Sequence, residues 1–184
     1  MIRRAVYSDL DAVACIYEEI HLEEEDGAVT TGWIRGVYPV RATAEAALKR
    51  GDLFVIDNNG EVLGAGIINK MQVDVYAQGR WEHQADAEHV CVLHTLTISP
   101  RAGRMGLGKR FVDFYESYAR DHGCLELRMD TNEWNVVARK MYGKLGFKEI
   151  GVVPTVFNGI PGVNLVLLEK YLGGERDKRK APKH

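Results

Sequence analysis

The residues best suited to chemistry form a glycine-rich loop between an apolar, strand-like run and an amphipathic helical pattern. The run occupies residues 91–98, Ser99-Pro100 follow it, the loop occupies residues 101–108, and the helical pattern begins at Gly106. Backbone N–H groups freed by the glycines, together with the unpaired N–H groups of a first helical turn, present partial positive charge to an anion. The loop is therefore predicted to bind a phosphate group without a metal.

Two familiar phosphate-binding loops fit this sequence poorly. Gly103, Gly108 and Lys109 have the spacing of a P-loop, but Arg110 stands where a Ser or Thr hydroxyl should bind magnesium. Gly106 and Gly108 begin a dinucleotide fingerprint, but Phe111 replaces the third small residue that lets the helix pack closely on its strand. An NTPase is thereby disfavoured, and a nucleotide-binding protein is the weakest of the alternatives kept.

The elements that must position this loop follow from hydrophobic periodicity and turn residues. Seven strands are predicted, at residues 2–6, 53–56, 62–68, 91–98, 124–129, 147–153 and 162–168. Four helices are predicted, at residues 8–26, 41–50, 106–122 and 135–144. The order β-α-α-β-β-β-α-β-α-β-β mixes hairpins with helical crossovers, so we expect an α/β fold of the α+β type with one mixed sheet.

Composition limits the classes of protein and partner. With 184 residues, 46% of them hydrophobic, the chain can bury one sizeable core, so we expect one domain over residues 1–172 and a basic, disordered tail at residues 173–184. A net charge of −2 gives no global attraction to nucleic acid or to an anionic bilayer. Lacking a secretory leader or a membrane-spanning run, the sequence predicts a cytoplasmic protein with no nucleic-acid or membrane partner.

The cysteines argue against a disulfide framework or a cysteine-based metal site. Cys15, Cys91 and Cys124 are odd in number, far apart and inside apolar runs, which is typical of buried thiols. On this basis we expect no bound metal.

A second pattern lies downstream of the loop. Asn135 is followed by Tyr142-Gly143-Lys144-Leu145-Gly146-Phe147, which is N-x(6)-Y-x-K-L-G-F. The loop and this pattern together resemble the two central motifs of the GNAT superfamily of acyl-CoA-dependent N-acyltransferases, whose element order the prediction also matches. The family loop is usually Gln/Arg-x-x-Gly-x-Gly/Ala, whereas here Gly103 stands at the Gln/Arg position, with Arg104 next to it.

The resemblance implies that the phosphate is the pyrophosphate of coenzyme A and that acetyl-CoA is the co-substrate. In the family, the strand before the loop splays from its neighbour, and its backbone carries the pantetheine arm and polarises the thioester carbonyl. Asn135 matches the family asparagine that hydrogen-bonds this arm, although it also suits the N-cap of its own helix. The implied cofactor-binding residues are Leu96, Thr97, Ile98, Gly103, Arg104, Met105, Gly106, Leu107, Gly108, Lys109 and Asn135.

Acyl transfer to an amine needs a deprotonated amine and a proton for the departing thiolate. The resemblance implies Tyr142 as the proton donor, against the alternative of a tyrosine packed on a helix face. His94 matches the second histidine of the H-x-H-A-L-A-V strand of arylalkylamine acetyltransferases, which implies a general base, against the alternative of a core histidine. Glu82, Asp86 and Glu88 are rival bases in the preceding loop.

Three aromatic residues, Trp33, Tyr38 and Trp81, lie where the family's acceptor site is walled. Such walls suit an apolar or cationic amine, but the same residues would serve equally as loop anchors. The sequence thus predicts an N-acetyltransferase that transfers acetyl from acetyl-CoA to a primary amine of a small molecule or peptide, by direct attack in a ternary complex, in a homodimer. The alternative is a non-catalytic acyl-CoA-binding module of the same fold.

Overall fold

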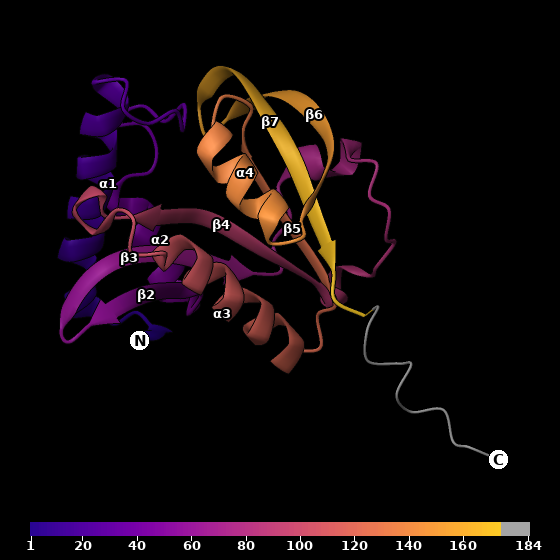
Figure 1. Cartoon of the computed structure of the whole chain (residues 1–184), viewed down its shortest axis with the longest axis horizontal. Coiled ribbons are helices and arrows are strands. Elements are labelled where there is room, and N and C mark those ends of the chain that lie inside the picture. The colour runs from indigo at the N-terminus through magenta and orange to yellow at the C-terminus, as the bar shows by residue number, and fades with distance from the viewer. Residues whose placement is uncertain (174–184) are drawn as a thin grey trace.

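One seven-stranded mixed sheet organises the computed structural model, which describes residues 1–173 (Figure 1). Across the sheet the strands are β1 (Ile2–Arg4), β2 (Leu53–Asn58), β3 (Glu61–Asn69), β4 (Val90–Ile98), β5 (Glu126–Asn132), β7 (Ile160–Tyr171) and β6 (Lys148–Phe157). Only β4 and β5 pair in parallel, and the other neighbours are antiparallel. The predicted fold class is confirmed. The expected tail lies outside the described residues beyond Gly173.

Four helices cover the two faces of the sheet. They are α1 (Leu10–Glu25), α2 (Arg41–Arg50), α3 (Leu107–Asp121) and α4 (Val136–Lys144). The helices α1 and α2 pack on one face of β2 and β3, whereas α3 and α4 pack on the other face of the sheet. The first face is completed over β4, β5, β6 and β7 by the loop of residues 70–89, which contains two short 3-10 helices (Asp74–Gln78 and Ala87–His89).

Close packing of α3 on the sheet explains a glycine that would otherwise weaken β3. Phe111 is fully buried, and a Cβ on Gly66 would lie 2.6 Å from its ring. The apolar residues of α3 recur at helical spacing and point into this core, as predicted. Gly66 therefore makes room for the aromatic ring that anchors the helix.

The central strands β4 and β5 pair along only part of their length. Val90–Leu93 pair with Glu126–Met129, yet β4 continues to Ile98 and β5 to Asn132. On its other side, β4 carries one extra residue relative to β3, and Thr95 adopts a φ of +49°. Since such a bulge bends and twists its strand, β4 turns away from β5. The predicted strand before the glycine loop thus splays from its neighbour.

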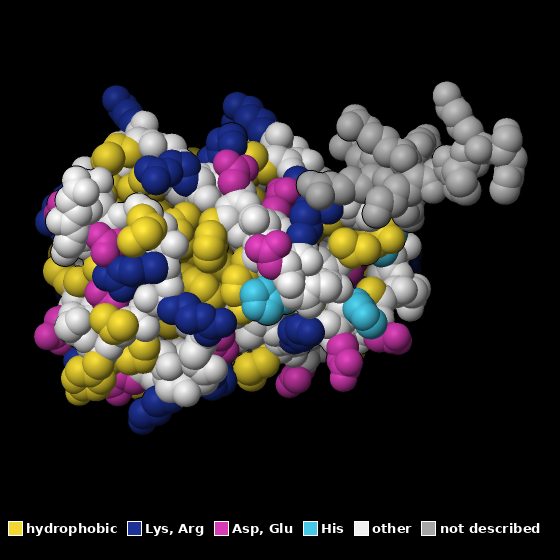
Figure 2. Space-filling model, turned by 90° about the horizontal axis from the view of Figure 1, so that it is seen from below, with side chains coloured by type: hydrophobic (Ala, Val, Ile, Leu, Met, Phe, Trp, Pro, Cys, Tyr) yellow, Lys and Arg dark blue, Asp and Glu magenta, His cyan; other side chains and the backbone are white. Residues whose placement is uncertain are grey.

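The surface carries charges of both signs. Figure 2 shows one face on which Lys and Arg side chains are interspersed with Asp and Glu around a hydrophobic patch. Among the helices of residues 1–173, none combines the length and the apolar character needed to cross a membrane. Cys91 and Cys124 are buried, but Cys15 is exposed, because it lies two residues after the buried Val13 on α1 and so faces outward.

The contact between β3 and α3 can be tested by Gly66→Ala. The added methyl group should destabilise the fold by about 1–3 kcal/mol, because it overpacks a buried ring. Gly151→Ala is the matched control, since a Cβ on this strand glycine meets nothing within 4 Å. Urea unfolding of both variants checks the expectation. Equal stability of the two would contradict it, and Phe111→Leu should partly rescue Gly66→Ala by removing ring atoms.

Candidate active site

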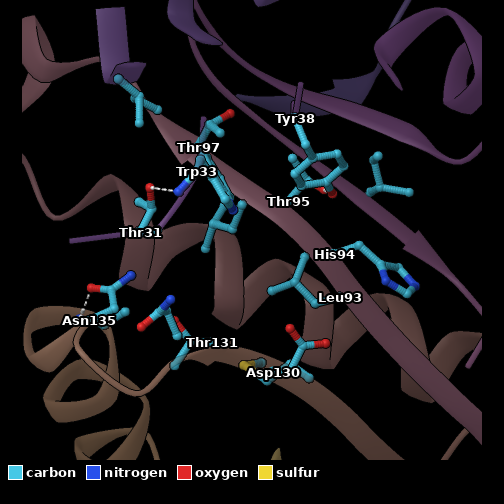
Figure 3. A pocket seen from close by; sticks show the side chains of 18 of the residues that line it. Thr31, Trp33, Tyr38, Leu93, His94, Thr95, Thr97, Asp130, Thr131 and Asn135 are labelled. Atoms are coloured by element: carbon cyan, nitrogen blue, oxygen red, sulfur yellow. Dashed lines mark hydrogen bonds between the residues drawn. The ribbon is translucent and has the colours of Figure 1, made fainter. Parts of the chain in front are cut away.

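A cavity of about 1710 Å³ extends between the diverging ends of β4 and β5. Figure 3 shows side chains converging on it from β4, β5 and the segment before α2. Of the residues predicted to bind the cofactor, to act as the catalytic pair Tyr142 and His94, or to form the aromatic wall, Met105 and Trp81 do not line it. The others do, and they are Trp33, Tyr38, His94, Leu96, Thr97, Ile98, Gly103, Arg104, Gly106, Leu107, Gly108, Lys109, Asn135 and Tyr142.

The glycine loop supplies backbone donors at the start of α3. Gly106 is the N-cap with φ +68°, no side chain caps the helix, and the first helical hydrogen bond runs from Arg110 N to Gly106 O at 3.1 Å. The N–H groups of Leu107, Gly108 and Lys109 precede that bond and are free to bind an anion at the cavity. The structure therefore contains the backbone arrangement that the sequence predicts.

The basic side chains of the glycine loop contribute less to anion binding than their number indicates. The Lys109 ammonium pairs with Asp113 at 2.6 Å, and the Arg101 guanidinium pairs with Glu19 at 2.9 Å. Both basic side chains are well exposed, so these pairs are weak and can open. The backbone N–H groups are thus the fixed part of the anion site. Gly103, at the family's Gln/Arg position, has no side chain to add to it.

The residues of β4 and α4 that the sequence assigns to the cofactor also have structural roles. The Thr97 hydroxyl donates to Ala65 O at 3.1 Å, so its side chain ties β4 to β3. Asn135 caps α4, its Oδ1 accepting from Ala138 N at 3.2 Å. Both residues also border the cavity. Capping and cavity lining are therefore compatible at Asn135.

Burial shifts the pKa values of Tyr142 and His94 in opposite directions. Tyr142 is 7% exposed, and burial, reinforced by the nearby charge of Asp130, holds its pKa well above the usual range. Burial lowers the pKa of His94 to about 4, and its Nε2 lies 3.0 Å from Asn69 Oδ1. At neutral pH the phenol keeps its proton, whereas the imidazole is neutral and weakly basic.

Asp130 is a candidate catalytic residue that sequence reasoning did not place in the site. It is the first residue of β5 beyond the paired stretch, and its carboxylate borders the cavity and accepts from Tyr76 OH at 2.8 Å. Burial raises the pKa of Asp130 to about 6, which is close to the pH at which a general base works best. The feature that could have identified Asp130 is its position near the end of a strand that runs parallel to β4.

Tyr38, Trp33 and Phe157 form an aromatic wall beside β4. Tyr38 packs edge-on against Trp33 and Phe157, with ring centroids 5.9 and 5.3 Å apart, and its hydroxyl hydrogen-bonds Thr95 Oγ1. Burial raises the pKa of Tyr38 to about 12, so its hydroxyl stays protonated. The wall is mainly hydrophobic, and its polar groups are this anchored hydroxyl and the indole N–H of Trp33.

Trp81 and the three acidic loop residues lie elsewhere. The Trp81 ring centroid lies 4.1 Å from the Arg128 guanidinium carbon, and the indole N–H donates to Tyr76 O at 2.7 Å. Glu82 pairs with Lys148 at 2.7 Å. Neither it nor Asp86 nor Glu88 lines the cavity. Trp81 thus anchors the loop that carries Tyr76. The three acidic residues that were alternatives to His94 as the base lie outside the cavity.

A family model described as "Acetyltransferase (GNAT) family" matches residues 15–147. No curated protein sequence matches the chain significantly. Among solved structures, an acetyltransferase of the GNAT family from Streptococcus agalactiae has a TM-score of 0.77 and 24% identity, covering 93% of this chain and 94% of that chain.

Two further structures have the same fold. The protein yncA from Salmonella typhimurium, solved with its cofactor acetyl-CoA, has a TM-score of 0.68 and 17% identity, covering 100% of this chain and 97% of that chain. A ribosomal-protein-alanine N-acetyltransferase from Brucella melitensis has a TM-score of 0.68 and 18% identity, covering 94% of this chain and 99% of that chain. At these identities the likeness establishes the fold alone.

The hydrogen bond from Tyr76 to Asp130 can be tested by titration. The phenolic O–H stabilises the charged carboxylate and so lowers its pKa, and Tyr76→Phe should therefore raise the pKa of Asp130 above the value near 6. Carbon-detected NMR of the carboxyl group, assigned with Asp130→Asn, measures the shift. Tyr118→Phe is the control, because Tyr118 accepts a hydrogen bond from Arg4 instead. An Asp130 pKa that does not respond to Tyr76→Phe would contradict the expectation.

Proposed function

Because the chain belongs to the GNAT family of acetyltransferases, we propose that it transfers an acetyl group from acetyl-CoA to a primary amine of a small molecule or peptide. The observation that carries this proposal is the continuity of one cavity. This cavity is lined by the free N–H groups at the start of α3, by the unpaired end of β4 and by the carboxylate of Asp130. Donor and acceptor could therefore meet in one ternary complex.

Acetyl-CoA would bind along the splayed edge of β4. The pyrophosphate takes the N–H groups of the glycine loop, and the pantetheine arm runs beside residues 96–98, whose backbone has no partner on β5. The arm thus replaces a missing strand, as peptides do when they add to an exposed sheet edge. Asn135 contacts the same arm from the start of α4, and the thioester lies near Tyr142.

The acceptor amine would lose its proton to Asp130, a role that the sequence had assigned to His94. A carboxylate with a pKa of about 6 is ionised at neutral pH and attracts a cationic amine, whereas His94, with a pKa of about 4, is the weaker base. The wall of Trp33, Tyr38 and Phe157 would border the amine's apolar part. His94 remains the alternative base.

The chemical step then balances as follows. The ammonium gives one proton to Asp130, the neutral nitrogen attacks the thioester carbon, and the C–S bond breaks. The departing thiolate takes the second proton that the nitrogen loses. Since Tyr142 holds its own proton far more tightly than a thiol of pKa about 8.5, its hydroxyl stabilises the thiolate as a hydrogen-bond donor.

Two measurements separate this proposal from its alternatives. A thermal shift with acetyl-CoA but not with ATP or NAD supports the donor, and the reverse result supports a nucleotide-binding protein. Thiol release from acetyl-CoA over a panel of amines then tests turnover. Binding of acetyl-CoA without thiol release on any amine would favour the non-catalytic module.

The glycine loop can be tested by Gly106→Val. A branched side chain at a φ of +68° carries about 1–3 kcal/mol of strain, and relief of that strain moves the N–H groups from their positions. We expect acetyl-CoA to bind at least about tenfold more weakly by calorimetry. Gly123→Val is the control, because Gly123 has a φ of +72° with equally open surroundings but does not line the cavity. Equal loss in both variants would indicate general destabilisation instead.

The general base can be identified from the pH dependence of kcat/KM. The base must be unprotonated, so the rate should fall as the pH drops through about 6 if Asp130 acts, and only near 4 if His94 acts. Asp130→Asn should lower kcat by about 10²–10⁴-fold and remove the limb near pH 6. His94→Ala should retain that limb. The opposite pattern would return the role to His94.

A further inference from the structure

A second cluster of chemically capable side chains lies at the other end of β5 from Asp130. Glu126 on β5 and Glu169 on β7 share one face of the sheet, because Arg128 pairs with Glu169 and Glu126 is two residues from Arg128. His83 reaches the same place from the loop of residues 70–89, and its ring stacks on Tyr171 with centroids 4.2 Å apart. Three separate segments thus bring a nitrogen and two carboxylates together.

The side-chain atoms that converge here are buried and unpaired. Glu126 is 0% and Glu169 is 1% exposed. Within residues 1–173, His83 Nδ1, Glu126 Oε2 and Glu169 Oε2 have no hydrogen-bond partner. One ligand atom from each residue lies within 4.8 Å of the others, and His83 Nδ1 is 3.9 Å from Glu126 Oε2. Such orphaned atoms are costly and require an explanation.

The other carboxylate oxygens are already held by the protein. Glu169 Oε1 accepts from Glu82 N at 2.8 Å, and Glu126 Oε1 lies 3.4 Å from Arg128 Nε. In each carboxylate, one oxygen is therefore held in place by the protein and the other has no hydrogen-bond partner in the described residues. Metal sites have this organisation, in which outer hydrogen bonds orient the atoms that bind the ion.

Charge in the cluster is unbalanced when both carboxylates are ionised. Arg128 is the one Lys or Arg side chain that pairs with either carboxylate in the described part of the chain, and it pairs with Glu126 alone while its guanidinium also donates to Gln72 Oε1 at 2.7 Å. A bound cation would offset this excess negative charge and would engage all three unpaired atoms.

We propose that His83, Glu126 and Glu169 bind one divalent transition-metal ion of the Zn²⁺ class. An imidazole nitrogen with two carboxylates is a donor set that suits zinc and its neighbours better than calcium or magnesium. We expected no bound metal because the sequence has no suitable cysteine pattern. That argument does not apply to a site built from a histidine and two carboxylates.

The distances are compatible with this donor set. Ligand atoms on one zinc ion lie about 3.4 Å apart, from bonds of about 2.1 Å at the tetrahedral angle. Because the three atoms lie within 4.8 Å of one another, the cluster must contract by up to about 1.4 Å. His83 can supply this movement, because its side chain is 41% exposed and sits on a loop. An adjoining opening of about 600 Å³, lined by Gln84, Asp86 and His89 among others, leaves room for a water or a fourth ligand.

The ion would fasten the loop of residues 70–89 to the sheet. At its other end the same loop carries Tyr76, which holds the Asp130 carboxylate at the cavity. The ion therefore lies outside the cavity and stabilises one of the walls that position the candidate base. Its role is structural, and its binding can be measured without any turnover.

The test uses the full chain, stripped with a chelator and titrated with Zn²⁺ by calorimetry. We expect one ion per chain. His83→Ala and Glu169→Gln should weaken binding at least as much as loss of an outer-shell partner, about 10–100-fold. His122→Ala is the matched control, since this histidine stacks on Tyr118 at the end of α3. Anomalous diffraction at the zinc edge should place the ion between the three side chains.

Three results would overturn the proposal. They are the absence of saturable one-to-one binding, binding of undiminished strength in His83→Ala, and loss of binding in His94→Ala or Asp130→Asn but not in His83→Ala. The last would place the ion in the main cavity. Because His83 is half-exposed on a loop, His83→Ala should fold normally, and its circular dichroism without metal checks this.

Discussion

The end of backbone pairing between β4 and β5 is the constraint on which the site depends. Beyond Leu93 and Met129 the two strands remain extended but no longer pair, and the bulge at Thr95 turns β4 away. Unpaired backbone groups inside a sheet are costly unless something else bonds them. The cavity occupies this place, with the glycine loop at the far end of β4 and Asp130 at the point of divergence.

Burial around this cavity separates the chemical roles of its ionisable groups. The same loss of solvent raises the pKa of the Asp130 carboxyl group, lowers that of the His94 imidazole, and keeps Tyr142 protonated. Proximity to the cavity alone would not distinguish Asp130 from His94 as a base. Their opposite responses to desolvation do, because a carboxylate becomes a stronger base when buried and an imidazole becomes a weaker one.

The sequence predicted local features that the structure contains. The glycine loop, Asn135 and Tyr142 belong to short motifs whose backbone geometry is set by residues close in sequence. Most of these residues border the cavity, and their binding and catalytic roles stay predictions. The hairpin at Asn59 and Gly60 was predictable for the same reason, since both residues adopt positive φ. The order of strands and helices followed from hydrophobic periodicity.

The missed features depend on contacts between distant segments. Tyr76 and Asp130 are 54 residues apart, and the loop of residues 70–89 has no periodicity that would place it over β5. Trp81, predicted to wall the acceptor pocket, packs instead on Arg128. Aromatic residues in such a loop are suited both to a pocket and to an anchor, so composition alone could not choose between them.

The polar face of β5 argues that this loop is a fixed wall of the site. Glu126, Arg128 and Asp130 alternate with the buried Leu127 and Met129, so a central strand presents three charged side chains to one face of the sheet. The loop approaches Glu126 with His83, covers Arg128 with Trp81 and hydrogen-bonds Asp130 through Tyr76.

Lifting the loop would break these contacts together and expose its buried apolar residues, Tyr76 among them. The cost of that opening is far greater than the cost of moving an exposed loop held by surface contacts. The carboxylate that would act on the acceptor amine is therefore positioned before any ligand arrives. Under the proposed function, selection of the acceptor would then come from the fixed shape and charge of this wall, and not from closure of the loop over a bound amine.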